Sequence, residues 1–362
     1  MKAAVYYGAG DIRIEQVADP SPGPGELLLE VHAAGICGTD VGEFVHGPMS
    51  YAVNGSLIPG HELSGRVIAG GPGTEEFQLG TVVASGAGIS CGECFQCHAG
   101  RTNLCLQYST VGLQRNGALA QFCVVPAATC LDVSAYGLDE ETAALAQPMA
   151  IAVHSMRRGR ISPGEDAVVI GAGGIGAFLI YAAAEAGARV TVVDLAPDRL
   201  ELARHLGAAE TIGPTDGVPL GNALAELDVH PMVVYEVTGG KAPFYEAIEA
   251  IMPGGRLVFV GLQADTRELD ARRLTLTEIE FIGTNAHVCS ADLPEALRLL
   301  AARGTPWNDV APIMLPLDEL VPHGIRPMAE GRATRVKTLI DPWADAPRER
   351  NQSVPTSVEE RN

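Results

Sequence analysis

The stretch "AVVIGAGGIGAFLIYAAAEAGARVTVVDL", residues 167–195, decides the fold class. A β-branched run leads into a glycine turn, an alanine-rich run follows, and a second β-branched run closes the stretch. This order is typical of a strand, a tight turn, a helix and a parallel strand. Similar alternations follow at 233–239, 244–255, 256–262 and 279–285. The sequence therefore predicts an α/β chain with a doubly wound parallel sheet.

The glycine turn has the spacing of a phosphate-binding loop. It reads G-x-G-x-x-G at Gly171, Gly173 and Gly176. The first glycine allows the tight turn, the second lets a pyrophosphate approach the backbone, and the third lets the helix pack on the strand. The N–H groups at the helix start, around Gly174 and Ile175, then face the anion. We predict a dinucleotide site at this turn.

An acidic residue ends the second strand of the same unit. Asp194 lies eighteen residues after Gly176. A carboxylate there accepts hydrogen bonds from ribose hydroxyls and repels a 2′-phosphate, which favours NAD over NADP. Leu195 and Ala196 follow without a basic side chain, whereas Arg199 lies near enough to leave NADP as an alternative.

Four of the eight cysteines lie within fifteen residues, spaced C-x2-C-x2-C-x7-C. Short C-x2-C turns supply paired sulfurs for tetrahedral zinc, and a closed shell of four thiolates leaves no position for a substrate. An iron–sulfur cluster is the alternative, but the bacterial ferredoxin pattern has a shorter last gap and a following proline. We expect a structural zinc site, with these ligands: Cys91, Cys94, Cys97 and Cys105.

The composition restricts the partners. A net charge of −19 argues against nucleic acid, whose phosphate backbone requires a basic protein face. Apolar runs are interrupted before the ~18 residues that a membrane helix needs, and residues 1–17 have no apolar core of signal-peptide type. We expect a cytoplasmic protein that binds neither nucleic acid nor a membrane.

A second set of metal-ligating residue types flanks an irregular loop. Cys37, His61 and Glu62 have ordinary explanations when taken singly: a buried thiol, a hydrogen-bonded histidine and a paired carboxylate. A four-cysteine lobe and a dinucleotide turn in the same chain favour a second metal site instead.

These motifs together resemble one family. With "GICGTD" at 35–40, "GHE" at 60–62, the four-cysteine lobe and "GAGGIG" at 171–176, the chain resembles the zinc-containing medium-chain alcohol dehydrogenases, in particular the polyol and 2,3-butanediol dehydrogenase branch. The resemblance runs from Met1 to about Pro342. It implies an oxidoreductase with one catalytic and one structural zinc ion, NAD, and assembly as a homodimer or homotetramer.

The resemblance also implies a domain plan. A β-rich, GroES-like catalytic domain would occupy residues 1–150, with the structural zinc lobe at about 88–108. An NAD-binding Rossmann domain would follow at 151–287, and residues 288–341 would return to the catalytic domain. Residues 342–362 lack apolar periodicity, and we predict a disordered tail there.

Site residues are implied position by position. Cys37 and His61 would bind the catalytic zinc, with Glu62 as a ligand or a nearby carboxylate. Asp40 would orient the imidazole of His61, and Thr39 would pass the substrate proton toward the cofactor ribose.

Two positions depart from the family pattern. Gln147 stands where many polyol dehydrogenases have a glutamate, so the third protein ligand is either this neutral amide or Glu62. Gly42 replaces a histidine that ends the proton relay in relatives, so that water or His46 would complete it.

The expected reaction interconverts a secondary alcohol and a ketone. The ends of parallel strands would border the nicotinamide with these residues: Val237, Thr238, Val260, Gly261 and Asn285. Asn285 has a turn at the strand end as its alternative role. Phe44, Met49, Tyr51 and Met149 are expected near the substrate pocket.

The substrate would be a vicinal diol, a polyol or a cyclic alcohol. A bulky alicyclic or sugar-like alcohol of a specialised pathway is the alternative. A zinc-free quinone or enoyl reductase and a non-enzymatic NAD-binding redox sensor are further alternatives, and both fit the cysteine pattern poorly.

Overall fold

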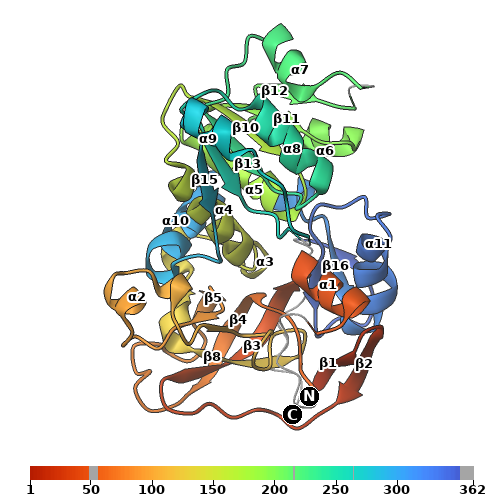
Figure 1. The fold of residues 1–362 in the computed structure, drawn as a ribbon. Coiled ribbons are helices and arrows are strands. Elements are labelled where there is room, and N and C mark those ends of the chain that lie inside the picture. Colours follow the sequence, from red (N-terminus) through yellow and green to blue (C-terminus); the bar gives the residue numbers. More distant parts are fainter. Residues whose placement is uncertain (49–55, 215–216, 264, 351–362) are drawn as a thin grey trace.

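The computed structural model describes residues 1–48, 56–214, 217–263 and 265–350. Two β-sheet units lie one above the other, with helices α4 (Ala146–Gly159) and α10 (Cys289–Ala302) between them (Figure 1). The fold is α/β and matches the expected class: a doubly wound sheet and a β-rich domain.

The upper unit is a six-stranded parallel sheet in the order β12-β11-β10-β13-β14-β15. Its strands are buried on both faces. Val168 packs in the cluster that contains α7 and α8, whereas Val169 packs in the cluster that contains α5. The elements are β10 (Asp166–Ile170), α5 (Gly174–Glu185), β11 (Arg189–Val193), α6 (Pro197–His205), β12 (Glu210–Ile212), α7 (Leu220–Glu226), β13 (Val233–Glu236), α8 (Lys241–Ala250), β14 (Arg256–Phe259), α9 (Ala271–Thr277) and β15 (Glu280–Gly283).

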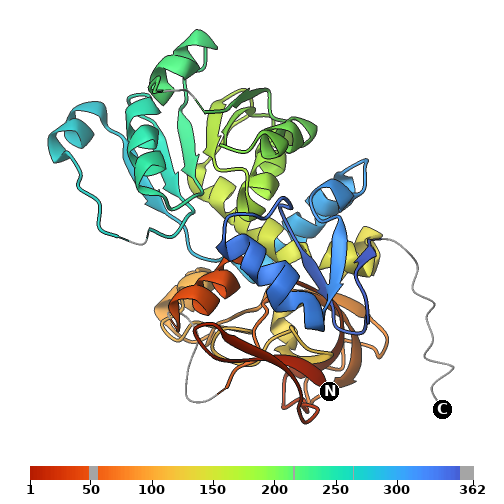
Figure 2. The same cartoon turned by 90° about the vertical axis from the view of Figure 1, so that its right-hand side faces the viewer.

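The lower unit contains a mixed sheet in the order β18-β16-β17-β3-β4-β5-β9, with β8 paired to β3. The strands are β3 (Glu26–Gly35), β4 (Glu62–Gly70), β5 (Val82–Ser85), β8 (Phe122–Pro126), β9 (Cys130–Asp132), β16 (Ile313–Pro316), β17 (Leu339–Asp341) and β18 (Arg348–Glu349). Because β17 pairs with β3, the segment after α10 returns to the sheet of the lower unit. Figure 2 shows this C-terminal part against the N-terminal strands.

Short elements complete the lower unit and carry much of the site. They are β1 (Lys2–Gly8), β2 (Asp11–Gln16), α1 (Gly38–His46), β6 (Gly88–Ile89), α2 (Phe95–His98), η1 (Thr102–Leu104), β7 (Ser109–Thr110), η2 (Ala127–Thr129), η3 (Ser134–Tyr136), α3 (Glu140–Ala143), η4 (Trp307–Asp309), η5 (Leu317–Glu319), η6 (Leu320–Ile325) and α11 (Arg326–Ala329). Helix α4 runs across residue 150, so it does not end where the first domain was expected to end.

The expected disorder from residue 342 onward is wrong for residues 342–350. Trp343 donates from Nε1 to the carbonyl of Val31 and meets Phe122 edge to face. Strand β18 pairs with β16, and Arg350 is buried. Apolar periodicity did not reveal this order, because charged side chains with buried partners hold the segment. The rest of the expected tail, 351–362, lies outside the described residues.

No helix in the described part of the chain is long and apolar enough to cross a membrane.

Candidate functional site

The four-cysteine lobe brings its sulfurs together. The Sγ atoms of Cys94 and Cys97 are 3.5 Å apart, and those of Cys91 and Cys105 are 3.4 Å apart. All four atoms lie within 4.8 Å of one another. Backbone N–H groups point at the sulfurs, as when Gln107 donates to Cys105 Sγ at 3.3 Å. This grouping of four thiols fits a closed tetrahedral zinc site.

Backbone hydrogen bonds favour a thiolate at one of these positions. Bonds from the N–H groups of Leu106 and Cys97 lower the pKa of Cys94 to about 6. A metal binds the thiolate form, so this environment favours metal binding near neutral pH.

A second metal-ligating group forms where β3, α1 and β4 meet. Cys37 is the N-cap of α1, and its backbone N–H donates to Asp40 Oδ2 at 2.9 Å. His61 directly precedes β4, and Glu62 begins it. The ligand atoms of Cys37, His61 and Glu62 lie within 4.8 Å of one another. The structure therefore brings together three residues that the sequence placed on two separate segments.

The pairing of β3 with β4 requires a glycine beside this group. Gly35 lies opposite Glu62 in the register. A Cβ atom at Gly35 would lie 2.1 Å from Glu62 Oε2. The carboxylate occupies the space that any other residue at position 35 would fill.

The charges of the group attract a cation. Burial lowers the pKa of His61, but the negative charges of Cys37 and Asp40 outweigh burial and raise this pKa to about 10. Among the described residues, the buried Nδ1 of His61 has no hydrogen-bond partner, and Asp40 Oδ1 lies 3.9 Å from it. An imidazole nitrogen without a partner, beside a thiol and two carboxylates, fits a zinc ion.

Sequence reasoning missed Lys337, which lies at the centre of the site. Its Nζ donates to Glu62 Oε1 at 2.6 Å and to the carbonyl of Ile36 at 3.2 Å. Burial lowers its pKa, but Glu62 and Cys37 outweigh this effect and raise it. One signal was present: Lys337 is one of three lysines among 25 basic residues and lies in an apolar strand segment.

The other predicted residues of the reaction centre lie on α1 and α4. Thr39 is in α1, with Oγ1 3.7 Å from Cys37 Sγ. Gln147 is buried at the second position of α4. His46 is exposed at the end of α1.

Of the four residues expected near the substrate pocket, two are buried and two lie outside the described residues. Met149 is fully buried in the core between the two units, so it does not line an open pocket. Phe44 is 7% exposed. Met49 and Tyr51 lie outside the described residues.

The glycine turn has the geometry of a phosphate cradle. Gly171 has φ +101°, and a Cβ at Gly176 would lie 1.9 Å from the carbonyl oxygen of Gly171. A Cβ at Gly173 would meet nothing within 4 Å. Helix α5 begins at Gly174, directly after this open position. The positive φ of Gly171 and the close contact at Gly176 are what a tight turn and close helix packing require, and the turn fits a dinucleotide.

Asp194 and Arg199 lie beside this turn. Asp194 Oδ2 accepts from the N–H of Ala172 at 2.8 Å, and Oδ1 accepts from Ala196 at 2.9 Å. Arg199 Nη1 lies 3.7 Å from Asp194 Oδ2. The Asp194 carboxylate thus stabilises the turn. It is also paired with Arg199, the cation that could bind the 2′-phosphate of NADP.

The loops after β13 and β14 are joined by Glu236, which the sequence analysis did not single out. Its buried carboxylate accepts from the N–H of Thr238 at 2.7 Å and from Gln263 Nε2 at 2.7 Å. Its carbonyl accepts from the N–H groups of Val260 and Gly261. Val237 follows Glu236 directly, so both predicted pairs of cofactor residues lie at one edge of the sheet.

Asn285 links the upper unit to the zinc lobe. Its Nδ2 donates to the carbonyl of Asn103 at 2.9 Å, and Asn103 Nδ2 donates to the carbonyl of Asn285 at 2.7 Å. The side chain expected at the nicotinamide is thus engaged with η1, two residues before Cys105. These bonds support the turn after β15, and a role of Asn285 at the nicotinamide stays a prediction.

Comparisons with known proteins agree with this geometry. Residues 23–135 match the alcohol dehydrogenase GroES-like domain, and residues 174–302 match the zinc-binding dehydrogenase domain. Sorbitol dehydrogenase of Bacillus subtilis (strain 168) is 32% identical over 292 residues, covering 78% of this chain and 81% of that protein.

Solved structures show the same architecture over 94% of this chain. The crystal structure of 2R,3R-butanediol dehydrogenase from Bacillus subtilis has a TM-score of 0.86, 27% identity and 99% of its own chain covered. A zinc-binding dehydrogenase from Sinorhizobium meliloti 1021, bound to NADP, has a TM-score of 0.86, 28% identity and 99% covered. This chain belongs to the zinc-containing medium-chain alcohol dehydrogenase family, in its polyol dehydrogenase branch, and is an oxidoreductase of that family.

Proposed function

We propose that this protein interconverts a secondary alcohol and a ketone by hydride transfer to NAD. The carrying observation is the position of Lys337, between the metal-ligating group and the dinucleotide turn. Its Nζ bonds to Glu62 and lies 3.9 Å from where a Cβ would stand on Gly174. The reaction requires the polarised alcohol and the hydride acceptor to lie close together.

Cys37 and His61 would hold the catalytic zinc. Bound zinc supplies Lewis-acid chemistry, which lowers the pKa of the substrate hydroxyl. The third protein ligand is Glu62 or Gln147. A loss of zinc in Gln147→Ala but not in Glu62→Ala would identify the amide, and the reverse result would identify the carboxylate.

Thr39 would accept the substrate proton at Oγ1 and donate its own toward the cofactor ribose. Its position 3.7 Å from Cys37 Sγ puts the hydroxyl beside the metal-ligating group. Water or His46 would complete the path to solvent. An unchanged pH–rate profile in His46→Ala would exclude the histidine.

The cofactor would lie along the glycine turn and the loops after β13 and β14. The α5 N-terminus would bind the pyrophosphate, and Asp194 would accept from the adenosine ribose. We propose NAD because Asp194 is paired with Arg199, which leaves no isolated cation for a 2′-phosphate among the described side chains next to Asp194.

A cytoplasmic homodimer or homotetramer is the proposed assembly. All eight cysteines lie in the described part of the chain and form no disulfide, which fits a reducing compartment. Strand β15 ends the six-stranded sheet, so its outer edge offers backbone groups to a second copy. Light scattering that gives a monomer would contradict this assembly.

The test is NADH formation by zinc-loaded protein with vicinal diols, polyols and cyclic secondary alcohols, with NADP in parallel. Turnover of diols or polyols with NAD supports the proposal. Turnover of cyclic or sugar-like alcohols alone keeps the chemistry and points to a specialised pathway. No turnover, together with one zinc ion per chain, would favour a redox-sensing module.

A further inference from the structure

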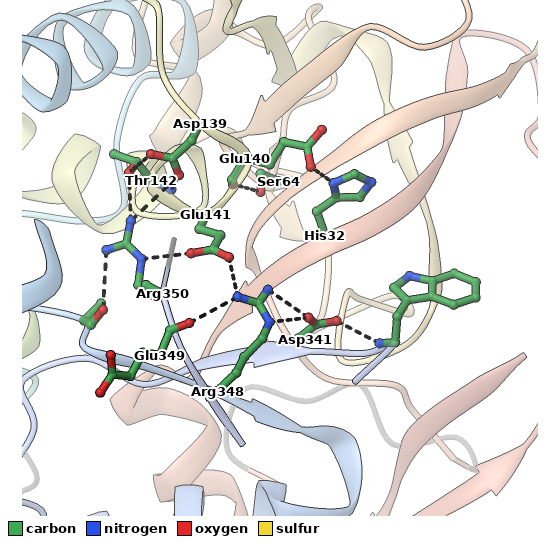
Figure 3. Close-up of polar contacts among 12 residues, drawn as sticks. His32, Ser64, Asp139, Glu140, Glu141, Thr142, Asp341, Arg348, Glu349 and Arg350 are labelled. Carbon is green, nitrogen blue, oxygen red and sulfur yellow. Dashed lines mark hydrogen bonds and ion pairs between the residues drawn. The ribbon is translucent and has the colours of Figure 1, made fainter. Parts of the chain in front are cut away.

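Residues 343–350, here called the C-terminal strap, cross the lower unit and end against α3 (Figure 3). The side chain of Arg350 is fully buried. Its Nη2 donates to Thr142 Oγ1 at 2.7 Å, and its Nε lies 3.5 Å from Glu141 Oε2. A buried guanidinium is tolerated when it is paired and hydrogen-bonded. Thr142 and Glu141 of α3 supply one hydrogen bond and an ion pair, and the carbonyl of Ala311 accepts from Nη1.

Arg348 fastens the strap at a second point. Its Nη1 donates to Glu141 Oε1 at 2.6 Å, and its Nη2 donates to Asp341 Oδ2 at 2.9 Å. Glu141 thus faces both arginines, and Asp341 connects Arg348 to β17. The pairing of β18 with β16 holds the backbone of the strap in place.

The opposite side of α3 is fastened to the catalytic sheet. Glu140 pairs with His32 of β3, and its carbonyl accepts from Ser64 Oγ (Figure 3). Glu140 also pairs with Arg66 of β4. Glu62 begins the same strand β4. Helix α3 is therefore held between the strand that carries Glu62 and the C-terminal strap.

Helix α3 leads directly into the segment that carries Gln147. Ala144 and Leu145 separate α3 from α4, and Gln147 is the second residue of α4. Helical backbone rises about 1.5 Å per residue, and Gln147 lies within two helical turns of Thr142 along the chain. A displacement of Thr142 would therefore displace Gln147 as well. The two candidates for the third zinc ligand thus lie on elements that α3 joins.

We propose that Arg350 is a positioning residue that, through α3, fixes Gln147 relative to Cys37, His61 and Glu62. The inference rests on the proposed catalytic zinc site.

The test compares Arg350→Met, Thr142→Val and Arg332→Ala with the parent protein. Thr142→Val removes the hydroxyl that meets Arg350 and nearly conserves volume, so it serves if Arg350→Met fails to fold. Arg332 pairs with Glu330 on the surface and is the control for loss of an ion pair. Each protein is loaded with cobalt, its visible spectrum is recorded, and metal release to a chelator is timed.

We expect Arg350→Met and Thr142→Val to change the absorption of the Cys37–His61 site and to release that metal about tenfold faster, the usual scale for residues that orient ligands. The four-cysteine site should release its metal at the parent rate. A lower melting temperature with unchanged spectrum and release would show a merely stabilising strap and overturn the inference. A parent protein that binds metal at the four-cysteine site alone would instead overturn the proposed function.

Discussion

Lys337 and Glu62 form a buried ion pair across 275 residues of sequence, with Nζ 2.6 Å from Oε1. The two side chains are 4% and 1% exposed. The pair joins β4, which follows His61, to the segment before β17. It also places a cation next to the first residue of α5. Metal site and cofactor turn are therefore in electrostatic contact before either ligand binds.

Replacing Lys337 by methionine should destabilise the protein and weaken NAD binding. Removing one partner of a buried pair leaves the other charge uncompensated, at a cost of about 3–5 kcal/mol. Urea unfolding and NAD titration measure the two effects. Lys337→Arg keeps the charge and should recover part of both. Equal NAD affinity in Lys337→Met and the parent protein would contradict the role beside Gly174.

Gly35→Ala should disturb the metal site without unfolding the catalytic sheet. The new methyl group would overlap the Glu62 carboxylate, which must then rotate away. We expect weaker zinc binding at the Cys37–His61 site, measured by competition with a chelator. Gly38→Ala is the matched control, because a Cβ there meets nothing within 4 Å. If both variants retain zinc equally, the Glu62 position does not matter to the metal.

Asp194→Ala should reduce the preference for NAD. The variant loses the acceptor for ribose hydroxyls and frees Arg199 to meet a 2′-phosphate. The ratio of kcat/KM for NAD to that for NADP should fall about tenfold or more, which corresponds to ~1.4 kcal/mol. In Asp194→Ala/Arg199→Gln, the gain with NADP should disappear. A persistent gain would show that another group holds the phosphate.

Asn103→Ala should loosen the connection between the zinc lobe and the turn after β15. It removes one of the two reciprocal amide bonds to Asn285, at a cost of about 1–3 kcal/mol for the buried groups left unpaired. Hydrogen exchange should quicken at residues 284–288, with zinc content unchanged. Asn222→Ala, an exposed change in α7, should leave this exchange alone. Loss of zinc in Asn103→Ala would mean that the asparagine supports the metal instead.

His287 should make stability fall in mild acid. Burial lowers its pKa to about 4 from 6.5, while Nε2 lies 2.9 Å from the carbonyl of Gly86. Between these two pKa values, His287 is protonated in the unfolded chain and neutral in the folded chain. The contribution of neutral His287 to the free energy of unfolding is complete above pH 6.5. As the pH falls toward 4, the free energy of unfolding decreases by about 3 kcal/mol.

Urea unfolding between pH 7 and 4 tests the His287 effect. The His287→Gln variant should show a shallower loss of stability than the parent protein across this range. His205→Gln, at a mostly exposed position, should behave like the parent. Identical slopes in all three proteins would rule out His287 as the source.

The sequence by itself determined the features whose residues lie close together along the chain. The three glycines of the turn, the four cysteines of the lobe and the Cys37–Asp40 cap each lie within a few residues of one another, so local geometry follows from the order of residues. The meeting of Cys37 with His61 was expected from resemblance, and the register of β3 with β4 produces it.

The tertiary structure alone decided the contacts between distant segments. Lys337 reaches Glu62 because β17 pairs with β3, and Arg350 reaches Thr142 because β18 adds to the same sheet. Asn103 and Asn285 meet across 182 residues. A single polar residue carries no periodic signal of its distant partner, because sheet order and register select that partner once the hydrophobic faces have packed. The sequence thus determined the fold class and the residues that could hold a metal, whereas folding decided which buried charges lie against those residues.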